Sequence, residues 1–547
     1  MFMFRRFLGL SVVIALLVAS PLRAAGQHGE SIVVAYVPGV AGDPFYVTLQ
    51  SGIMQGFEDG SAKVAFIALS PAQFSVEEQI ARLEEVIARG DVDYLLVAPV
   101  DSQLLIPVLE KAYHAGIKII TVDTFIGDGD YASGSVTFPL AHIGPADRTS
   151  GYMACRAAPD ACPIPNALDH LRAGNTRAEI IARKPFDIGY WAAVLAVAHA
   201  RGYESIPKRV PVDTVRIDAG NVDDPALARY FYSDTLLKPQ PTLTNLTIAF
   251  VMGVQRDPPD PFYVTLAKGV QAAAEVYGVH VITGAPAHFS PDEQIPVIED
   301  IIATNHIDYM IAAPTDRDAL IPILQQISES GIPVITVDTF IGDGDYESGS
   351  VTFPLTYIGS DNVMGGYIAC SQLAMADILG TGAKIYIQNV RRGISTTDQR
   401  EAGCLAAAAD FELEVVKIDY SDNVVEDSRA QTIQMLAEHP DIVGIFGTNV
   451  FSAQGAGAAV QDVGLGGIVE VVAFDATEFA IDLLRNGTVT QVIAQKPADM
   501  GYFAVLSAVA HARGIHSIPK RWSTGYEVIN LNNVDDPQIA RFIYREK

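Results

Sequence analysis

The chain has 547 residues, of which 37 are basic and 64 are acidic, and its formal net charge is −27 at pH 7. Because this acidity comes without any cluster of lysine or arginine, the chain repels phosphate backbones, and we expect no nucleic acid partner. Four cysteines are too few to build a disulfide scaffold in a chain of this length.

Residues 1–25 have the pattern of a secretory signal peptide. Arg5 and Arg6 form a basic start, residues 8–19 form an apolar core, and the small residues at 24–25 suit cleavage. The apolar core is shorter than the stretch of about 20 residues that crosses a bilayer, and no later stretch is long and uninterrupted enough. We expect an exported protein that is soluble after cleavage. The alternative is an uncleaved N-terminal anchor.

Much of the sequence occurs twice. DPFYVTL at 43–49 returns at 260–266, and VDTFIGDGDY at 122–131 returns at 337–346. AHARG, SIPKR and NVDDP recur in the same order. This internal duplication indicates two related domains. The first copy lacks a long central stretch that the second copy contains between the same landmarks.

We expect three parts after the signal segment. Residues 31–232 form a truncated domain (copy one), residues 233–246 form a linker rich in proline and threonine, and residues 247–547 form a complete domain (copy two). Copy one keeps the strands and helices of a first lobe, with a crossing at 143–147 and a returning helix at 190–200.

In copy two, short apolar runs alternate with longer amphipathic stretches, which predicts βαβ units around parallel sheets. The expected strands are 247–254, 279–283, 309–314, 333–338, 383–390, 414–420, 442–449 and 469–475. Helices fill the intervals between them, including one from about Thr397, and a last helix covers 502–512. The alternation restarts after residue 358, so copy two has two Rossmann-like lobes.

Three polar residues end apolar strands: Asp338 in the first lobe, and Asn449 and Asp475 in the second. Ligands of open α/β sheets bind beyond the carboxyl ends of the strands, so these side chains are candidates for a shared cleft. Asp and Asn are also common turn formers, which is the alternative for each residue taken alone.

DPFYVTL, the VDT that ends the fourth strand, and IGSDNVMGG at the crossing make copy two resemble the type I periplasmic sugar-binding proteins. The resemblance is to the ribose-binding and autoinducer-2-binding relatives. It implies a clamshell with three hinge crossings, near 358–362, 494–497 and 524–528. Lobe one then comprises about 247–357 and 497–520, and lobe two about 362–494 and the C-terminal tail.

The resemblance also implies a set of ligand-binding residues. They are Asp260, Phe262, Tyr263, Asp338, Thr339, Asp398, Gln399, Arg400, Asn449, Asp475 and Gln495. The aromatic pair would stack on a sugar ring, while carboxylates and amides would hold its hydroxyl groups. Arg400 has the alternative of a simple charge at a helix start.

Two departures from the ribose-binding pattern make ribose itself doubtful. Thr339 stands where those proteins have an arginine, and Ala313 where they have an asparagine. The resemblance implies no cofactor and no metal ion. Carboxylates alternate at Asp343, Asp345 and Glu347, but they fall short of calcium-loop spacing, which indicates a solvated acidic loop.

The cysteines suggest two disulfides, Cys370 with Cys404 and Cys155 with Cys162. An oxidising compartment permits such pairs. Buried or free thiols are the alternative.

Copy one keeps only half a site, which consists of Asp43, Phe45, Tyr46 and Asp123. Arg183 replaces the counterpart of Gln495, and the second-lobe residues have no counterpart. Half a cleft offsets the cost of immobilising a small ligand poorly, so we expect no sugar binding there. The exposed cleft face of copy one could dock on copy two or on a neighbouring chain. The alternative is a decaying copy without a role.

We therefore expect a monomeric periplasmic, or otherwise secreted, protein that binds a monosaccharide or small polyol. The family-implied partner is the inner-membrane permease of an ABC importer. The alternative is a sensory receptor that uses the same clamshell. We expect no enzyme, because the sequence lacks GxSxG, HExxH and P-loop motifs.

Overall fold

The computed structural model describes residues 31–145, 171–173, 179–241, 243, 245–255, 259–375 and 382–545. The predicted signal segment, the cysteines at 155 and 162, and the end of the predicted crossing at 143–147 lie outside these residues. Within the described part of the chain, no helix combines the length and apolarity needed to cross a membrane.

Copy one is built around a parallel six-stranded sheet with the strand order β2-β1-β3-β4-β5-β7. Its elements are β1 (Ile32–Val37), α1 (Pro44–Asp59), β2 (Val64–Ala68), α2 (Val76–Arg89), β3 (Tyr94–Val97), α3 (Ile106–His114), β4 (Lys118–Val122), β5 (Ala141–Pro145), β6 (Glu179–Ala182), α5 (Pro185–Ala200), β7 (Arg209–Val212), β8 (Val215–Asp218) and the 3₁₀-helix η1 (Pro225–Tyr230). The antiparallel pair β6-β8 is separate from this sheet. It is the described remnant of a second lobe.

Lobe one of copy two repeats this sheet, with the order β10-β9-β11-β12-β13-β19 and parallel pairing throughout. Its elements are β9 (Thr247–Val251), α6 (Pro261–Tyr277), β10 (His280–Gly284), α7 (Pro291–Thr304), β11 (Tyr309–Ala312), α8 (Ile321–Glu329), β12 (Val334–Val337), β13 (Thr356–Gly359), α14 (Pro497–Ala512) and β19 (Arg521–Ser523).

Lobe two has the strand order β15-β14-β16-β17-β18-β20, and β20 is antiparallel to β18. Its elements are α9 (Asn362–Met375), β14 (Lys384–Asn389), α10 (Ser395–Asp410), β15 (Glu414–Tyr420), α11 (Val425–Glu438), β16 (Ile442–Gly447), α12 (Val450–Asp462), β17 (Glu470–Phe474), α13 (Glu478–Arg485), β18 (Gln491–Ala494), β20 (Glu527–Ile529) and η2 (Ala540–Phe542). A disulfide between Cys370 and Cys404 joins α9 to α10.

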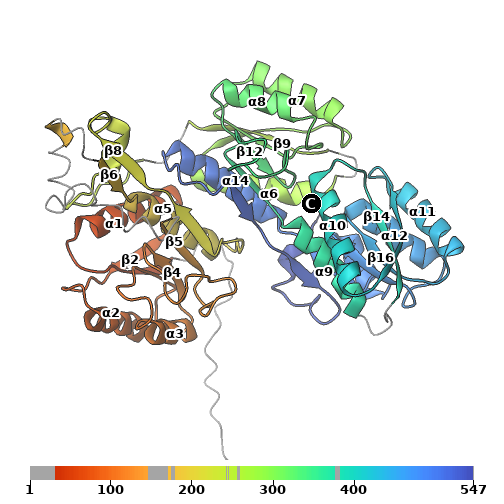
Figure 1. The fold of residues 1–547 in the computed structure, drawn as a ribbon, viewed down its shortest axis with the longest axis horizontal. Helices are drawn as coiled ribbons and strands as arrows, with labels where there is room; N and C mark the ends of the chain where they lie inside the picture. The colour runs from red at the N-terminus through yellow and green to blue at the C-terminus, as the bar shows by residue number, and fades with distance from the viewer. Residues whose placement is uncertain are drawn as a thin grey trace, which may run out of the picture.

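The chain crosses between the lobes of copy two three times: from β13 to α9, from β18 to α14, and from β19 to β20. The predicted α/β clamshell with two parallel-sheet lobes and three crossings is therefore confirmed. Figure 1 shows lobe one, in green, above α14 and lobe two, in cyan and blue, to its right.

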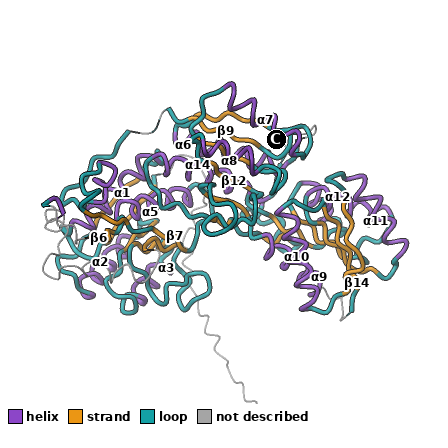
Figure 2. The backbone as a smooth tube through the Cα atoms, turned by 45° about the horizontal axis from the view of Figure 1, so that its top comes forward, coloured by secondary structure: helices purple, strands orange, loops and turns teal. Residues whose placement is uncertain are grey.

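Copy one packs on lobe one through the helices that cover one face of its sheet. Helices α5 and α14 are apolar on all sides, which predicts complete burial, and nearly all of their residues are buried. One cluster of buried hydrophobic side chains runs through both copies. Figures 1 and 2 both place α5 close to α14. Copy one therefore contacts copy two through this helical face and not through its cleft face.

Specific polar contacts fix the two copies to each other. The indole N–H of Trp191 donates to the Ser517 carbonyl at 3.1 Å, and that of Trp522 donates to the Ser205 carbonyl at 2.8 Å. Arg513 forms an almost fully buried ion pair with Asp59, with Nε 2.9 Å from Oδ2. Hydrogen bonds of this kind have directional geometry, so the contact has a defined register.

The segment between the copies lies along α1. The backbone N–H of Ser233 donates to Thr48 Oγ1, and that of Leu237 donates to Ser51 Oγ. One turn further on, Gln55 Oε1 accepts from the N–H of residue 240. The connection is therefore attached to copy one by side chains spaced along a single helix.

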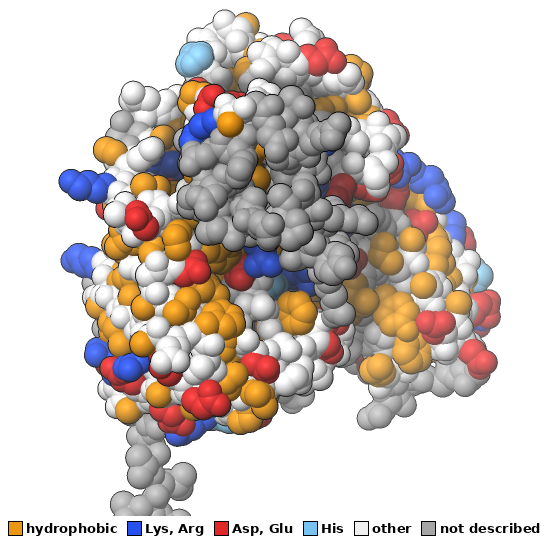
Figure 3. Space-filling view, turned by 60° about the vertical axis from the view of Figure 1, so that its left-hand side comes forward, with side chains coloured by type: hydrophobic (Ala, Val, Ile, Leu, Met, Phe, Trp, Pro, Cys, Tyr) orange, Lys and Arg blue, Asp and Glu red, His pale blue; other side chains and the backbone are white. Residues whose placement is uncertain are grey.

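On the face shown in Figure 3, acidic and basic side chains are interspersed among the described residues.

Candidate functional site

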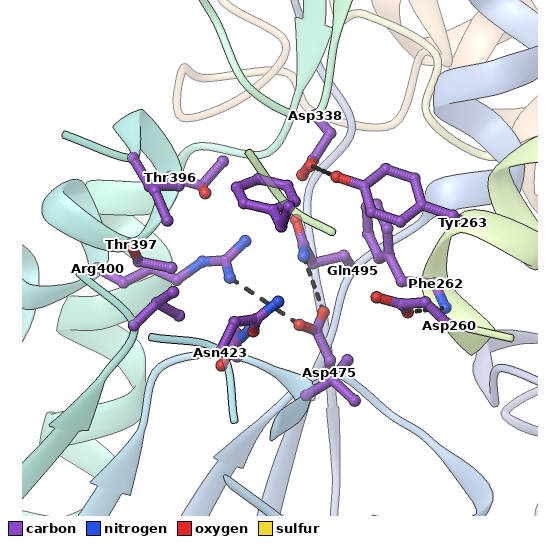
Figure 4. A pocket seen from close by; sticks show the side chains of 15 residues that line it. Asp260, Phe262, Tyr263, Asp338, Thr396, Thr397, Arg400, Asn423, Asp475 and Gln495 are labelled. Carbon is purple, nitrogen blue, oxygen red and sulfur yellow. Dashed lines mark hydrogen bonds and ion pairs between the residues drawn. The ribbon is translucent and has the colours of Figure 1, made fainter. Parts of the chain in front are cut away.

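A cavity with an empty volume of about 460 Å³ lies between the two lobes of copy two. The cavity is lined by Asp260, Phe262, Tyr263, Phe289, Asp338, Val390, Ile394, Thr396, Thr397, Arg400, Asn423, Asn449, Val450, Asp475 and Gln495. Figure 4 shows polar side chains from both lobes pointing toward one another across it.

Two aspartates occupy equivalent positions in the two lobes. Asp338 directly follows β12, and Asp475 directly follows β17. Both residues adopt left-handed backbone conformations, with φ of 63° and 76°. Aspartate tolerates this conformation better than bulkier residues do. Each strand therefore ends with a carboxylate in the cleft, as the sequence predicts.

Arg400 lies opposite these carboxylates and is the only cation among the described residues that line the cavity. Its Nε donates to Asn362 Oδ1 at 2.9 Å, and its Nη1 donates to the Thr448 carbonyl at 2.9 Å. The guanidinium carbon lies 3.9 Å from the centre of the Phe474 ring. The buried Nη2 has no hydrogen-bond partner among the described residues. The side chain is thus held rigidly while one donor is left for a bound molecule.

Burial dominates the electrostatics of the two carboxyl groups. It raises the pKa of Asp338 to about 7, against an opposing effect of Arg400 and with a smaller contribution from the charge on Asp475. Burial also raises the pKa of Asp475, which the Arg400 charge and the Gln495 hydrogen bond oppose. The distance from Arg400 Nη1 to Asp475 Oδ2 is 4.0 Å. One cation thus compensates two buried acids incompletely.

Aromatic side chains form the lobe-one wall. Phe262 and Tyr263 are perpendicular, with ring centres 5.3 Å apart. The Tyr263 hydroxyl donates to Asp338 Oδ2 at 3.2 Å. Asp260 caps the start of α6 by accepting the Phe262 N–H at 2.9 Å. This cap fixes the first turn of the helix, which carries both aromatic side chains. A flat apolar surface next to oriented carboxylates suits a ring that carries hydroxyl groups.

Amide side chains complete the lobe-two and hinge walls. Asn449 Nδ2 donates to Asn423 Oδ1 at 2.7 Å, while Asn449 Oδ1 caps α12. Gln495 Nε2 donates to Asp475 Oδ1 at 2.8 Å, and Gln495 Oε1 accepts from Ser360 Oγ at 2.8 Å. These bonds fix the orientation of each amide.

The family model for a periplasmic binding protein domain matches residues 34–164 and 248–515. The chain belongs to this family. It is 30% identical over 251 residues to the ribose import binding protein of Bacillus subtilis, a match that covers 46% of this chain and 77% of that protein. It is 25% identical over 276 residues to the D-allose-binding periplasmic protein of Escherichia coli, covering 50% and 87%.

A solved structure of an ABC transporter solute binding protein from Agrobacterium vitis, bound with alpha-D-tagatopyranose, is also similar. It has 43% identity and a TM-score of 0.52, and the match covers 55% of this chain and 99% of that one. Coverage of about half the chain agrees with one complete copy of the periplasmic binding protein fold.

Three residues predicted for the binding site lie outside the cavity lining. The Thr339 hydroxyl donates to the Pro314 carbonyl at 2.5 Å. Asp398 accepts the Gly393 N–H at 3.0 Å and lies 3.7 Å from Arg317 of lobe one. Gln399 is half-buried elsewhere on α10.

Besides Arg400, helix α10 presents other residues to the cavity than the resemblance implies. The helix begins at Ser395, two residues before the predicted start. Thr396, Thr397 and Arg400 are spaced by three and four residues and therefore share the face toward the cavity. The Thr397 hydroxyl is buried there without a hydrogen-bond partner among the described residues.

Tyr544, near the C-terminus, supports the site from behind and was not predicted. Its hydroxyl accepts the Gln495 N–H at 2.7 Å and lies 3.3 Å from Asp475 Oδ1. Its ring is 5.9 Å from that of Phe262, edge to face. Tyr544 thus contacts residues of both lobes and of the hinge. The sequence signal available was the repeat itself, since Tyr232 occupies the same position in copy one.

We expect Tyr544→Phe to weaken ligand binding about tenfold, because it removes one hydrogen bond that orients Asp475 and one that holds Gln495. Isothermal titration measures this change. Tyr232→Phe is the matched control: its hydroxyl lies 3.5 Å from the Arg183 carbonyl in copy one and should not affect affinity. Equal affinities for all three proteins would contradict the role of Tyr544.

The lobes touch across the mouth of the cleft. Arg391 of lobe two donates to the carbonyls of Phe289 and Thr315 in lobe one, both at 3.2 Å. Ser395 Oγ accepts the Phe340 N–H at 3.1 Å. These contacts describe a closed arrangement of the clamshell.

In copy one, the half-site is filled by its own side chains. Arg183 Nη1 lies 2.7 Å from Asp123 Oδ1, and its guanidinium group lies 6.0 Å from the Phe45 ring centre. Tyr232 packs edge-on against Phe45 at 5.4 Å, and Asp43 caps α1 next to Tyr46. The ion pair gives Asp123 the partner that a ligand would otherwise provide. This geometry supports the prediction that copy one binds no sugar.

Proposed function

We propose that the chain captures a monosaccharide in its pyranose form between the lobes of copy two. The observation that carries this proposal is the buried Arg400, whose Nη2 amino group has no partner among the described residues, in a cavity that Asp338, Asp475 and an aromatic wall also line. A sugar ring matches this arrangement, because its hydroxyls can donate to carboxylates and accept from a guanidinium group while its apolar face lies on a ring.

Among monosaccharides, a ketohexose is favoured over ribose. The Agrobacterium vitis protein that is 43% identical was solved with tagatopyranose. Thr339 is turned to the Pro314 carbonyl, and Ala313 offers no hydrogen bond from its side chain, so two polar ligands of the ribose pattern are replaced. The sequence was already at odds with ribose at these two positions.

We further propose that the mature protein is a periplasmic monomer that delivers this sugar to the permease of an ABC importer. Uptake of the radiolabelled sugar should be lost when the gene is deleted. The wild-type gene should restore uptake, and an Asp338→Ala variant should not. Full uptake with the variant would contradict a delivery role.

The direct test is isothermal titration of the mature chain with pentoses, aldohexoses, ketohexoses including D-tagatose, and small polyols. We expect one site per chain, lost in Asp338→Ala and kept in Asp123→Ala. Two sites would show that copy one binds as well. No heat with any member of the panel would contradict the proposed ligand class.

A further inference from the structure

Two residues of copy one lie against the segments that join the lobes of copy two. Ser205 Oγ is 2.6 Å from Asp499 Oδ2 and 2.9 Å from the Thr524 carbonyl oxygen. The same Asp499 oxygen accepts the backbone N–H groups of Glu204 and Ser205, at 3.0 and 2.8 Å. Asp499 is in the first turn of α14, just after the second crossing, and Thr524 begins the third crossing. One short segment of copy one therefore holds two crossings.

The Glu204 carboxylate reaches two further parts of this region. Lys496 Nζ lies 3.8 Å from Glu204 and 3.0 Å from Glu527. Arg541 forms an ion pair with Glu204. Lys496 adjoins Gln495 of the cavity, and Arg541 precedes Tyr544 by three residues. The two cations that contact Glu204 are thus close in sequence to Gln495 and Tyr544, which both form hydrogen bonds to Asp475.

The contact between Ser205 and Asp499 is buried, whereas the Glu204 side chain is exposed to solvent. Ser205 and Asp499 are each 6% exposed. The Ser205 carbonyl also accepts the Trp522 indole N–H, and the Trp522 ring stacks on Phe503 at 4.7 Å. A buried carboxylate that loses its donors costs far more than a solvated one. The segment is therefore held in place on the crossings.

We propose that copy one supplies positioning residues, Glu204 and Ser205, that set the hinge of copy two in its closed geometry. Hinge closure brings Arg400 of lobe two to Asp338 of lobe one. The apparent affinity for the sugar therefore falls in proportion when a smaller fraction of the chains is closed. The effect on affinity rests on the proposed sugar binding, whereas the effect on the hinge does not. The truncated copy thus acts as a fixed support for a moving cleft.

The repeat provides a matched control. Ser517 occupies the position of Ser205 in copy two, and its hydroxyl accepts the Asp213 N–H of copy one at 3.3 Å. It belongs to the same interface but contacts none of the crossings through that hydroxyl. Ser517→Ala therefore weakens the contact between copies without releasing the hinge.

The test measures the distance between lobes in the full, ligand-free chain by pulsed electron resonance. Spin labels carried by non-natural amino acids replace Gln326 on α8 and Ala437 on α11, both exposed. We expect the double variant Glu204→Gln/Ser205→Ala to broaden the distance distribution toward longer values, and Ser517→Ala to match the unmodified chain. Sugar affinity should fall about tenfold in the double variant alone.

An unchanged distance distribution in the folded double variant overturns the proposal. If that variant does not fold, Glu204→Gln alone, which leaves the Ser205 contacts intact, must shift the distribution in the same direction, or the proposal fails. A shift in distance together with no binding of any sugar in any variant would retain the hinge role and reject the proposed function.

Discussion

Arg400→Lys is expected to lower sugar affinity about a hundredfold while the chain stays folded. The guanidinium group makes two hydrogen bonds to the protein and still presents Nη2 to the cavity. An ammonium group is a point charge that cannot keep this fork geometry. The loss of one hydrogen bond to a charged group is worth about 1.5 to 3 kcal/mol, which sets the expected scale.

Arg400→Met should add a loss of stability. It leaves the buried Asp338 and Asp475 without their nearest cation, and breaking a buried charge pair costs about 3 to 5 kcal/mol. Titration calorimetry and urea unfolding separate the two effects. Arg392→Lys is the matched control, because this exposed arginine precedes the same helix and lies outside the cavity lining. Unchanged affinity in Arg400→Lys would remove this residue from the site.

Asp338→Asn is expected to make the ligand-free chain more stable at about pH 8 and to lower its sugar affinity about a hundredfold. Burial raises the pKa of Asp338 to about 7 in the folded chain, above its value in the unfolded chain. Between about pH 4 and pH 7 the folded chain holds a proton that the unfolded chain has released. This group therefore lowers the free energy of unfolding as the pH rises, by about 1.4 kcal/mol per pH unit at most.

Urea unfolding at about pH 5 and pH 8 tests this sign, because the stability advantage of Asp338→Asn should grow with pH. Sugar hydroxyls donate best to the ionised carboxylate, so wild-type affinity should rise as the pH approaches 7 and flatten above it. Asp123→Asn is the control, since Asp123 has the same position in copy one and is paired with Arg183. It should leave sugar affinity and its pH profile unchanged. An affinity of wild type that falls with rising pH would contradict this account of Asp338.

The sequence was sufficient for those site residues that are tied to strand ends. Apolar periodicity locates β12 and β17, and the residue after each strand must lie at the carboxyl edge of its sheet. Residues placed by a helix register were less predictable. Asp398 and Gln399 were expected from the family resemblance, and the structure places them on α10 outside the cavity lining, whereas Thr396 and Thr397 line the cavity.

Contacts that depend on the tertiary arrangement could not be predicted from local patterns. Tyr544 reaches Asp475 across 69 residues of sequence, and the turn at Asn423 has a positive φ that asparagine permits but does not require. The docking face did have a signal. Helices α5 and α14 are apolar on every side, and such helices need cover on both faces.

Ser205 and Ser517 occupy equivalent positions in the two copies, and the backbone carbonyl of each accepts a tryptophan indole N–H from the other copy, so the junction joins two related domains within one polypeptide. Because the segment along α1 ties the partners together, their association is intramolecular, and short tethers correspond to effective concentrations in about the millimolar range. A contact too weak to pair free subunits can therefore be fully formed here. The helices that form this contact belong to the first lobe of each copy. Loss of most of the second lobe from copy one therefore removes its cleft but leaves the contact between the copies intact.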